Sequence, residues 1–334
     1  MGVKAGIAGY GLAGAVFHAP LIEHVDGLAV SAVMTRSPER AEQARSAHEG
    51  VRIVDSVEAL IDGVDVLVVA TPNAAHVEVA RAGLERGLHV VVDKPMAVTA
   101  ADAQSLADAG DERLTVFHNR RWDGDFLTLQ RLIGEGVLGP VTRFESRFER
   151  FRPEVKQGWR ELGDAAEGGG VLLDLGPHLI DQALQLFGPV AAVHAEVRTR
   201  RADARVDDDV FVALEHESGQ ISHLWMSAIA PLHGPRFRVS GLRGGFGCDG
   251  LDPQEGQLSD GMRPGEPGYG DGGAGWLSPA DVAGAQVALQ RGCYERFYEG
   301  VRDWVAGNAP APVDPQDGVR ALEIIEQARE SARG

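Results

Sequence analysis

Two separated stretches of this sequence carry side chains that are suited to moving a proton. The first is Asp93-Lys94-Pro95, and the second runs from Gly168 to His178 and includes Asp174. Only three of the 32 Lys and Arg side chains are lysines, so a lysine is expected where an arginine cannot replace it. An ammonium group can give up its proton near neutral pH, whereas a guanidinium cannot. Lys94 is therefore the lysine predicted to take part in catalysis.

The second stretch predicts a base at the start of a helix. Pro177 suits the first turn of a helix, so His178 is expected within that turn. The positive end of the helix dipole would disfavour the imidazolium and keep the ring available as a base. Asp174, four residues earlier, could hold a substrate hydroxyl or orient this imidazole. The alternative for such a histidine is a simple cap or surface residue.

The start of the chain predicts a cofactor site. Apolar residues of strand character lead into a Gly-x-Gly-x-x-Gly turn, and a helical apolar pattern follows. This is the context of a dinucleotide-binding turn, in which the glycines allow a tight bend, close approach of the pyrophosphate and close helix packing. The cofactor-binding residues predicted here are Gly9, Tyr10, Gly11, Leu12, Ala13 and Gly14.

The segment after the predicted second strand bears on the choice of cofactor. A site that prefers NAD usually carries an acidic residue there, to bind the ribose 2′-hydroxyl. This chain has Thr35, Arg36 and Ser37 instead, which suit a 2′-phosphate. NADP is therefore favoured, with NAD as the alternative; the competing interpretation makes Arg36 a surface residue at a helix start.

Three further predicted strands, at 65–70, 89–92 and 114–117, end in polar clusters. Such apolar runs are typical of strands that are buried on both faces of a parallel sheet, where ligands bind at the carboxyl ends. Helix caps also gather there, so each single residue has that alternative. The cofactor-binding residues predicted at the first two of these ends are Thr71, Pro72, Asn73, His76, Asp93 and Lys94.

From Val141 onward the pattern changes to alternating strands without intervening helices, at 141–149, 190–199, 208–216, 220–229 and 236–240. The fold class is thus α/β, with a doubly wound parallel sheet followed by an α+β part that has a large, mostly antiparallel sheet. We predict a dinucleotide-binding domain over residues 1–120 and a substrate and oligomerisation domain over 121–334. Helices are predicted over 282–305 and 315–332, and we expect them to pack on the two domains, including back on the first.

The strand predicted over residues 220–229 has apolar side chains on both faces, including Trp225 and Met226. One face can take helices of the same chain, and the other is expected to contact a second subunit. A homodimer or homotetramer through this open sheet face is the predicted assembly. The segment 249–275, with nine glycines and three prolines, is predicted to be a long loop that closes over the site or reaches a neighbouring subunit.

Composition narrows the range of partners. A formal net charge of −17 disfavours the binding of nucleic acid, whose phosphates are also negative. No apolar run is long enough to cross a membrane. No signal segment is recognisable, so a cytoplasmic location is the expectation. Cys248 and Cys293 have neither metal nor redox spacing, so free thiols and no metal site are expected.

Together these motifs make the chain resemble the Gfo/Idh/MocA oxidoreductases over nearly its whole length. The motifs are the glycine turn with Phe17-His18-Ala19-Pro20, then Asp93-Lys94-Pro95, Asn119-Arg120-Arg121-Trp122, and Gly168-Gly169-Gly170 through Asp174 to His178. Within that family, the sequences of these motifs are most similar to the NADP-linked branch that resembles scyllo-inositol dehydrogenases. The resemblance implies a Rossmann domain and an open-faced domain that binds a small polyhydroxylated substrate, a sugar or an inositol.

The resemblance also implies roles for single residues. Lys94, Asp174 and His178 would hold the catalytic positions of the family, and Asn119, Arg120 and Trp159 would border the substrate. One departure is Asp93, where the family usually has Glu. Two other functions remain as alternatives: a catalytically idle NADP sensor of the same fold, and a reductase of a non-sugar carbonyl or imine.

Overall fold

The computed structural model describes residues 2–155 and 168–333, which form two compact units. The first unit comprises Met1–Asn119, Gln254–Tyr269 and Cys293–Val319. The second comprises the intervening segments and the C-terminal end, namely Arg120–Pro253, Gly270–Gly292 and Arg320–Gly334. Each unit thus combines segments that lie far apart in the sequence.

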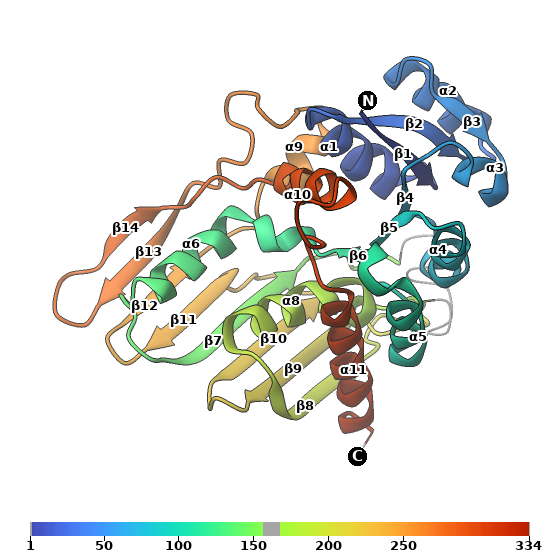
Figure 1. Ribbon diagram of the computed structural model, residues 1–334. Coiled ribbons are helices and arrows are strands. Elements are labelled where there is room, and N and C mark those ends of the chain that lie inside the picture. Colours follow the sequence, from blue (N-terminus) through green and yellow to red (C-terminus); the bar gives the residue numbers. More distant parts are fainter. Residues whose placement is uncertain (1, 156–167, 334) are drawn as a thin grey trace. The chain divides into compact units, whose positions relative to one another are not determined.

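The first unit is built on a six-stranded parallel sheet with the order β3-β2-β1-β4-β5-β6 (Figure 1). Its strands are β1 (Val3–Ala8), β2 (Leu28–Met34), β3 (Arg52–Val54), β4 (Val66–Val69), β5 (His89–Asp93) and β6 (Leu114–Phe117). All four residues of β4 are buried, as expected of a strand covered on both faces. The chain order reverses between β1 and β4, and such a switch point is where doubly wound sheets bind ligands. The predicted parallel sheet is confirmed.

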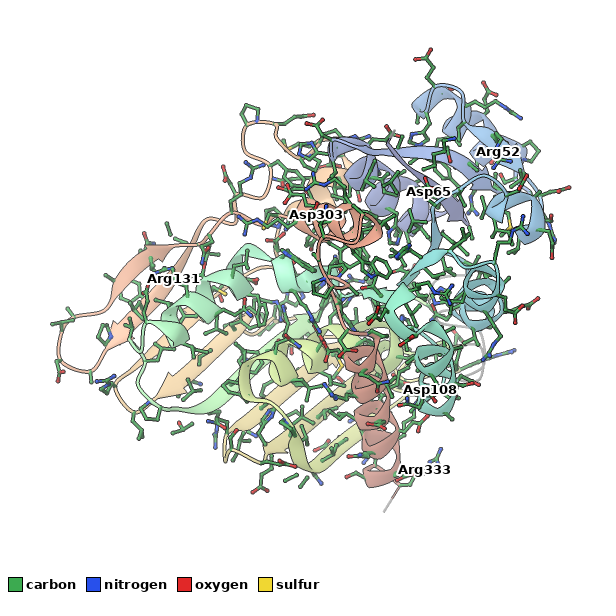
Figure 2. All side chains as sticks on the ribbon, viewed as in Figure 1. Arg52, Asp65, Asp108, Arg131, Asp303 and Arg333 are labelled. Atoms are coloured by element: carbon green, nitrogen blue, oxygen red, sulfur yellow. The ribbon has the colours of Figure 1, made fainter. Side chains whose placement is uncertain are left out.

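Helices of the first unit begin at residues that satisfy their free N–H groups. The side-chain oxygens of Ser37, Ser56 and Thr99 each accept a backbone N–H three residues later, at the starts of α2, α3 and α5. Arg52 of β3 donates to the carbonyl groups of Ala59 and Asp62, which ties the edge strand to α3 (Figure 2). The helices are α1 (Ala19–His24), α2 (Pro38–Ala47), α3 (Val57–Ile61), α4 (His76–Glu85), α5 (Ala100–Gly110), α9 (Gln254–Ser259) and α10 (Glu295–Val305).

The second unit is built on an eight-stranded sheet with the order β14-β13-β12-β11-β7-β10-β9-β8 (Figure 1). Only β7 and β10 pair in parallel among these neighbours, so the predicted mostly antiparallel sheet is confirmed. The strands are β7 (Val141–Glu149), β8 (Val190–Arg198), β9 (Asp209–His216), β10 (Ile221–Ser227), β11 (Phe237–Gly241), β12 (Gly244–Cys248), β13 (Ala274–Pro279) and β14 (Ala285–Ala288).

Helices cover one face of this second sheet. Helix α6 (Gly124–Gly134) packs Phe126 against Phe237 of β11, and α8 (Val171–Phe187) packs Phe187 against Phe144 of β7. Helix α11 (Pro315–Ser331) is joined to β8 through Ser331, whose hydroxyl accepts the N–H of Ala195. On this face the alternate residues of β10 are buried, while Ile221, His223 and Trp225 on the other face are only half-buried.

Two predictions about the C-terminal part need correction. The predicted helix over 282–305 begins only at Glu295, because residues 285–288 form β14 and pair with β13. The predicted loop over 249–275 contains α9, whose Gln254 and Leu258 are buried. The glycine and proline content of 249–275 favoured a loop, yet the six residues of α9 include Gly256. The apolar pattern over 282–305 favoured a helix, yet its first part is extended in β14. Both cysteines are free and buried, as expected.

Candidate active site

The glycine turn of the first unit shows why two of its three glycines are needed. Gly9 has a φ of 94°, and a Cβ there would lie 2.5 Å from the carbonyl oxygen of Ala70. A Cβ at Gly14 would lie 2.1 Å from the carbonyl oxygen of Gly9. At Gly11 a Cβ would meet only the Arg40 side chain, 3.8 Å away, so no protein contact demands a glycine there. Among the described residues, the backbone therefore excludes a Cβ at Gly9 and Gly14, whereas the space beside Gly11 is open.

The other predicted residues of the turn divide by the direction of their side chains. Leu12 and Ala13 lie at its surface, and Leu12 is exposed. Tyr10 is buried, and its hydroxyl is 2.8 Å from Nε2 of His48. Nδ1 of His48 lies in turn 3.2 Å from the carboxylate of Glu23. Tyr10 can therefore contact a cofactor only through its backbone.

Residues 35–37, directly after β2, include Arg36 and no carboxylate, and Glu39 and Arg40 follow in the first turn of α2. Thr35 and Ser37 are half-buried, with the hydroxyl of Thr35 accepting the N–H of Ser37 and that of Ser37 capping α2. Arg36 is exposed. Arg40, in the first turn of α2, places its guanidinium next to Gly11. Arg40 was not identified from the sequence, although its position one turn after Ser37 on a capped helix could have indicated it.

At the carboxyl end of β4, His76 joins two loops. Its Nδ1 lies 2.9 Å from the carbonyl oxygen of Pro95, and its Nε2 lies 2.9 Å from that of Thr71. Burial lowers the pKa of His76, while Asp93 and the two carbonyl groups act in the opposite direction. Both ring nitrogens face protein, so the ring links the segment after β4 to the Lys94-Pro95 turn. Of the remaining predicted residues, Pro72 is exposed and Asn73 is buried.

Lys94 follows directly on β5, in the same unit as the glycine turn. Oδ1 of Asp93 accepts the backbone N–H of Lys94 at 2.8 Å, and both residues are half-buried. The Lys94–Pro95 peptide bond is cis. The short carboxylate therefore caps the turn that carries the lysine.

In the second unit Asp174 and His178 both lie on α8, but the expected place of His178 is wrong. Helix α8 begins at Val171, so His178 is in its third turn and Pro177 lies inside the helix. The positive end of the helix dipole therefore lies near Asp174, which is in the first turn. At His178, two turns further on, this dipole no longer disfavours an imidazolium. The four-residue spacing still places the two side chains on one face of the helix.

The start of α8 is fixed by Asp207, which the sequence did not indicate. Its Oδ2 accepts the N–H of Leu172 at 2.7 Å, and its backbone carbonyl accepts the N–H of Val171. Gly170 has a φ of 99°, and a Cβ there would lie 2.3 Å from this carboxylate. Burial raises the pKa of Asp207, although the hydrogen bond from the Leu172 N–H acts to lower it. The last glycine of the predicted motif is therefore needed to cap the helix.

A charged pair and an amide hold the next turn of α8. Arg121 donates from Nε and Nη2 to the two carboxylate oxygens of Asp181, at 2.9 and 2.5 Å. Gln182 donates to the carbonyl oxygen of Arg120 at 2.9 Å and accepts from Arg236 at 2.7 Å. A bidentate pair of this kind fixes both the distance and the orientation of its partners.

The residues predicted to border the substrate are only partly described. Asn119 and Arg120 are both buried; Arg120 lies over the Phe148 ring at 4.7 Å and pairs with Asp123 at 3.3 Å. Trp159 lies outside the described residues. Within the described residues no group of His, Cys, Asp and Glu side chains could hold a metal ion, and no described helix is long and apolar enough to span a membrane.

Known proteins resemble this chain along its whole length. Residues 3–119 match the model of an oxidoreductase family with an NAD-binding Rossmann fold, and residues 126–247 match the Gfo/Idh/MocA C-terminal domain. The chain is 35% identical to scyllo-inositol 2-dehydrogenase (NADP(+)) IolW of Bacillus subtilis, over 99% of this chain and 94% of that protein. It is 37% identical to the uncharacterized oxidoreductase YdgJ of Escherichia coli, over 99% and 96%.

A solved structure agrees with these matches. The structure of yvaA from Bacillus subtilis covers 100% of this chain and 98% of its own, with a TM-score of 0.91 and 33% identity. Both halves of the sequence, both sheets and the glycine turn thus point to one group of enzymes. The chain belongs to the Gfo/Idh/MocA family of oxidoreductases.

Proposed function

We propose that this protein is an NADP-dependent dehydrogenase that acts on a hydroxyl-bearing ring carbon of a sugar or inositol. The observation that carries this proposal is the full-length similarity to an NADP-linked scyllo-inositol dehydrogenase. The side chains agree with it: Lys94 follows β5 in the unit of the glycine turn, and Asp174 and His178 share one face of α8.

The preference for NADP rests on charge in the segment after β2. A carboxylate at this place would accept hydrogen bonds from a ribose 2′-hydroxyl and would repel a 2′-phosphate. Arg36 is exposed there, and the guanidinium of Arg40 lies beside Gly11. Arginines pair with phosphate through several N–H groups, so this segment supports NADP over NAD.

The proposed reaction gives each side chain one task. When bound, the nicotinamide supplies the acceptor for a hydride. His178 takes the proton of the substrate hydroxyl as general base, and Asp174 either orients this imidazole or binds a neighbouring hydroxyl. The Lys94 ammonium stabilises the negative charge that develops on the substrate oxygen. Asn119, Arg120 and Trp159 are proposed to border the substrate.

A substrate panel tests the proposal. Inositols and aldoses are assayed by absorbance at the nicotinamide band, with NADP and NAD in parallel. We expect turnover on at least one polyol, with NADP as the better cofactor. Lys94→Ala and His178→Asn should each lower kcat by about a hundredfold or more, since each removes one group that stabilises charge or moves the proton.

Matched variants separate the competing functions. Lys94→Arg keeps the positive charge but cannot release a proton, while Arg86→Ala removes an exposed charge in the same unit and should have no effect. Binding of NADPH without turnover on any polyol, carbonyl or imine would identify a sensor and refute the dehydrogenase. Turnover on an imine or a non-sugar carbonyl alone would refute the substrate class. Full turnover of Lys94→Ala or His178→Asn would refute the assigned roles.

We also propose that a second copy of the chain covers the open face of the second sheet, giving a homodimer or homotetramer. Phe211 and Trp225 lie on that face with their rings 5.0 Å apart, and the guanidinium of Arg147 lies 3.8 Å from the Trp225 ring. A hollow of about 400 Å³ adjoins these rings. Sedimentation should show an oligomer that Trp225→Glu dissociates; a monomeric wild type would refute this assembly.

A further inference from the structure

His18 is a buried histidine that no proposed step uses. It is the last residue of a wide, π-type helical segment, Ala13–His18, in which the N–H of Ala19 bonds to the carbonyl oxygen of Gly14, five residues earlier. Such segments are rare and occur frequently at functional sites. The segment follows directly on the glycine turn and places His18 among groups from three other elements.

Three side chains of the first unit surround this ring. Nδ1 of His18 lies 2.6 Å from the hydroxyl of Tyr298 on α10, and the ring packs against Phe117 of β6 with centroids 4.5 Å apart. Nε2 lies 4.0 Å from Oδ2 of Asp93 at the end of β5 and has no hydrogen-bond partner among the described residues. His76 is the remaining titratable group that acts on it. The imidazole thus stands between a phenol and the carboxylate that caps the Lys94 turn.

The place of the proton on this ring can be argued from its neighbours. Burial lowers the pKa of His18 to about 4, so the ring is neutral at pH 7 and carries one N–H. Burial and Asp93 raise the pKa of Tyr298, so the phenol keeps its proton. If the phenol donates to Nδ1, the N–H lies on Nε2 and faces the Asp93 carboxylate. The opposite arrangement would direct the Nε2 lone pair at that carboxylate, which is unfavourable.

We propose that His18 is a positioning residue for Lys94: it carries its proton on Nε2, faces Asp93 with it, and so holds the carboxylate that caps the lysine turn. Oδ1 of Asp93 accepts the Lys94 N–H, while Oδ2 lies opposite Nε2. The 4.0 Å gap is too long for a direct hydrogen bond, so the effect is electrostatic orientation of the carboxylate. The assignment rests on the proposed function only for the importance of Lys94.

The first test needs no substrate. Nitrogen-15 NMR of the imidazole rings reports which ring nitrogen carries the proton in the free protein at pH 7. We expect His18 to be protonated on Nε2, and Tyr298→Phe to remove this preference. Tyr294→Phe, which alters an equally buried tyrosine of the same unit, should leave it unchanged. A proton on Nδ1 in the wild type would overturn the inference, whether or not the protein is a dehydrogenase.

The second test follows Lys94 itself. Reductive methylation with carbon-13 labels the three lysines and the N-terminal amine, so the Lys94 signal can be assigned by comparison with a Lys94→Arg sample. His18→Leu and Tyr298→Phe should move the Lys94 signal and leave that of Lys4 in place. His18→Gln, whose amide can donate in place of Nε2–H, should restore much of the wild-type position. An unmoved Lys94 signal in a folded His18→Leu or Tyr298→Phe protein would overturn the inference.

Kinetics on the best substrate then distinguish positioning from simple loss of fold. His18→Leu should lower kcat by roughly ten- to a hundredfold, as small displacements of catalytic groups do, with the Kd for NADPH within about twofold of wild type. His18→Gln should recover part of kcat. A rise in the NADPH Kd with kcat unchanged would refute positioning of Lys94 and indicate a role in cofactor binding instead.

Discussion

Lys94 in the first unit and His178 in the second are surrounded by different kinds of interaction. The turn of Lys94 is held by Asp93 and by the rings of His76 and His18, both of which burial drives toward the neutral form. The helix of His178 is held by buried charges, with the Arg121–Asp181 pair on one side. The first site therefore depends on neutral rings and on backbone geometry, and the second depends on charge pairing.

The buried charges of the second unit extend well beyond α8. Arg236 is almost fully buried between Ser146, Gln182 and Asp125. Burial raises the pKa of Asp125 to about 6, and it raises that of neighbouring Asp123 well above the usual range, although Arg236 and Arg120 act against this. The comparison teaches that the two proposed catalytic groups are held by different electrostatic means, neutral rings in the first unit and paired charges in the second. Acid and charge removal should therefore affect the two units differently.

The largest expected effect is the loss of a buried charge on α8. Asp181→Asn leaves Arg121 without its bidentate carboxylate, in a place where both side chains are largely buried. Breaking such a pair should lower the free energy of unfolding by about 3 kcal/mol, measured by urea denaturation. Arg131→Ala breaks the exposed Arg131–Glu135 pair of α6 in the same unit (Figure 2) and should cost less than about 0.5 kcal/mol. Equal effects of the two variants would show that buried charge does not hold this unit.

In the first unit, the comparable loss of stability is expected from substitution of a glycine in the glycine turn. Gly14→Ala places a methyl group against the Gly9 carbonyl and should cost about 2 to 3 kcal/mol of stability. Gly11→Ala meets only the flexible end of Arg40, so the protein should stay as stable as wild type while losing NADPH binding. Thermal unfolding and fluorescence titration with NADPH measure the two effects. A destabilised Gly11→Ala protein would mean that packing, and not a ligand, demands that glycine.

The sequence predicted those features that follow from local pattern. The glycine turn, the buried strands β4 to β6 and the alternating strand β7 leave periodic or positional signals, and each is where it was expected. The start of α8 was missed because Asp207, 36 residues after Val171, supplies its cap, and Pro177 imitates a first-turn proline. Partners that are distant in sequence, such as His18 with Tyr298, leave no local pattern at all.

Mild acid should affect the stability of the two units differently. At pH 5, protonation of His18 should lower the free energy of unfolding of the first unit by about 2 kcal/mol, and the second unit should not lose stability. The folded pKa of His18, about 4, lies below the ordinary value of 6.5, so the unfolded chain takes up the proton first. The stabilisation from His18 is therefore present above pH 6.5 and is lost as the pH falls toward 4, with about 2 kcal/mol gone at pH 5. Asp125 has the opposite sign: its folded pKa, about 6, lies above the ordinary 3.8, so its contribution grows as the pH falls through 6.

Hydrogen exchange at pH 7.5 and pH 5, corrected for the intrinsic exchange rates, measures the stability of each unit separately. Amides of β1, β4 and β5 should lose protection at pH 5, and those of β7 and β10 should keep theirs. His18→Leu should reduce the acid response of the first unit and leave the part that comes from His76. Asp125→Asn should reduce the gain of the second unit and leave the part that comes from Asp123. His24→Gln alters an exposed histidine and should do neither. Parallel loss of protection in both units would contradict the electrostatic comparison.

The smallest expected effect concerns Arg40, a charged side chain beside the glycine turn of the first unit. Arg40 is exposed and lies beside Gly11, so it can reach a 2′-phosphate without the desolvation that the buried arginines of the second unit have undergone. Arg40→Ala should weaken NADPH binding about tenfold, which corresponds to about 1.4 kcal/mol, and leave NADH binding unchanged. Inhibition by 2′,5′-ADP should fall by the same factor and that by 5′-AMP should not. Arg45→Ala, which removes an exposed arginine of the same helix, should change neither; if it weakens NADPH binding as much as Arg40→Ala, the effect is general electrostatic attraction and the specific contact is refuted.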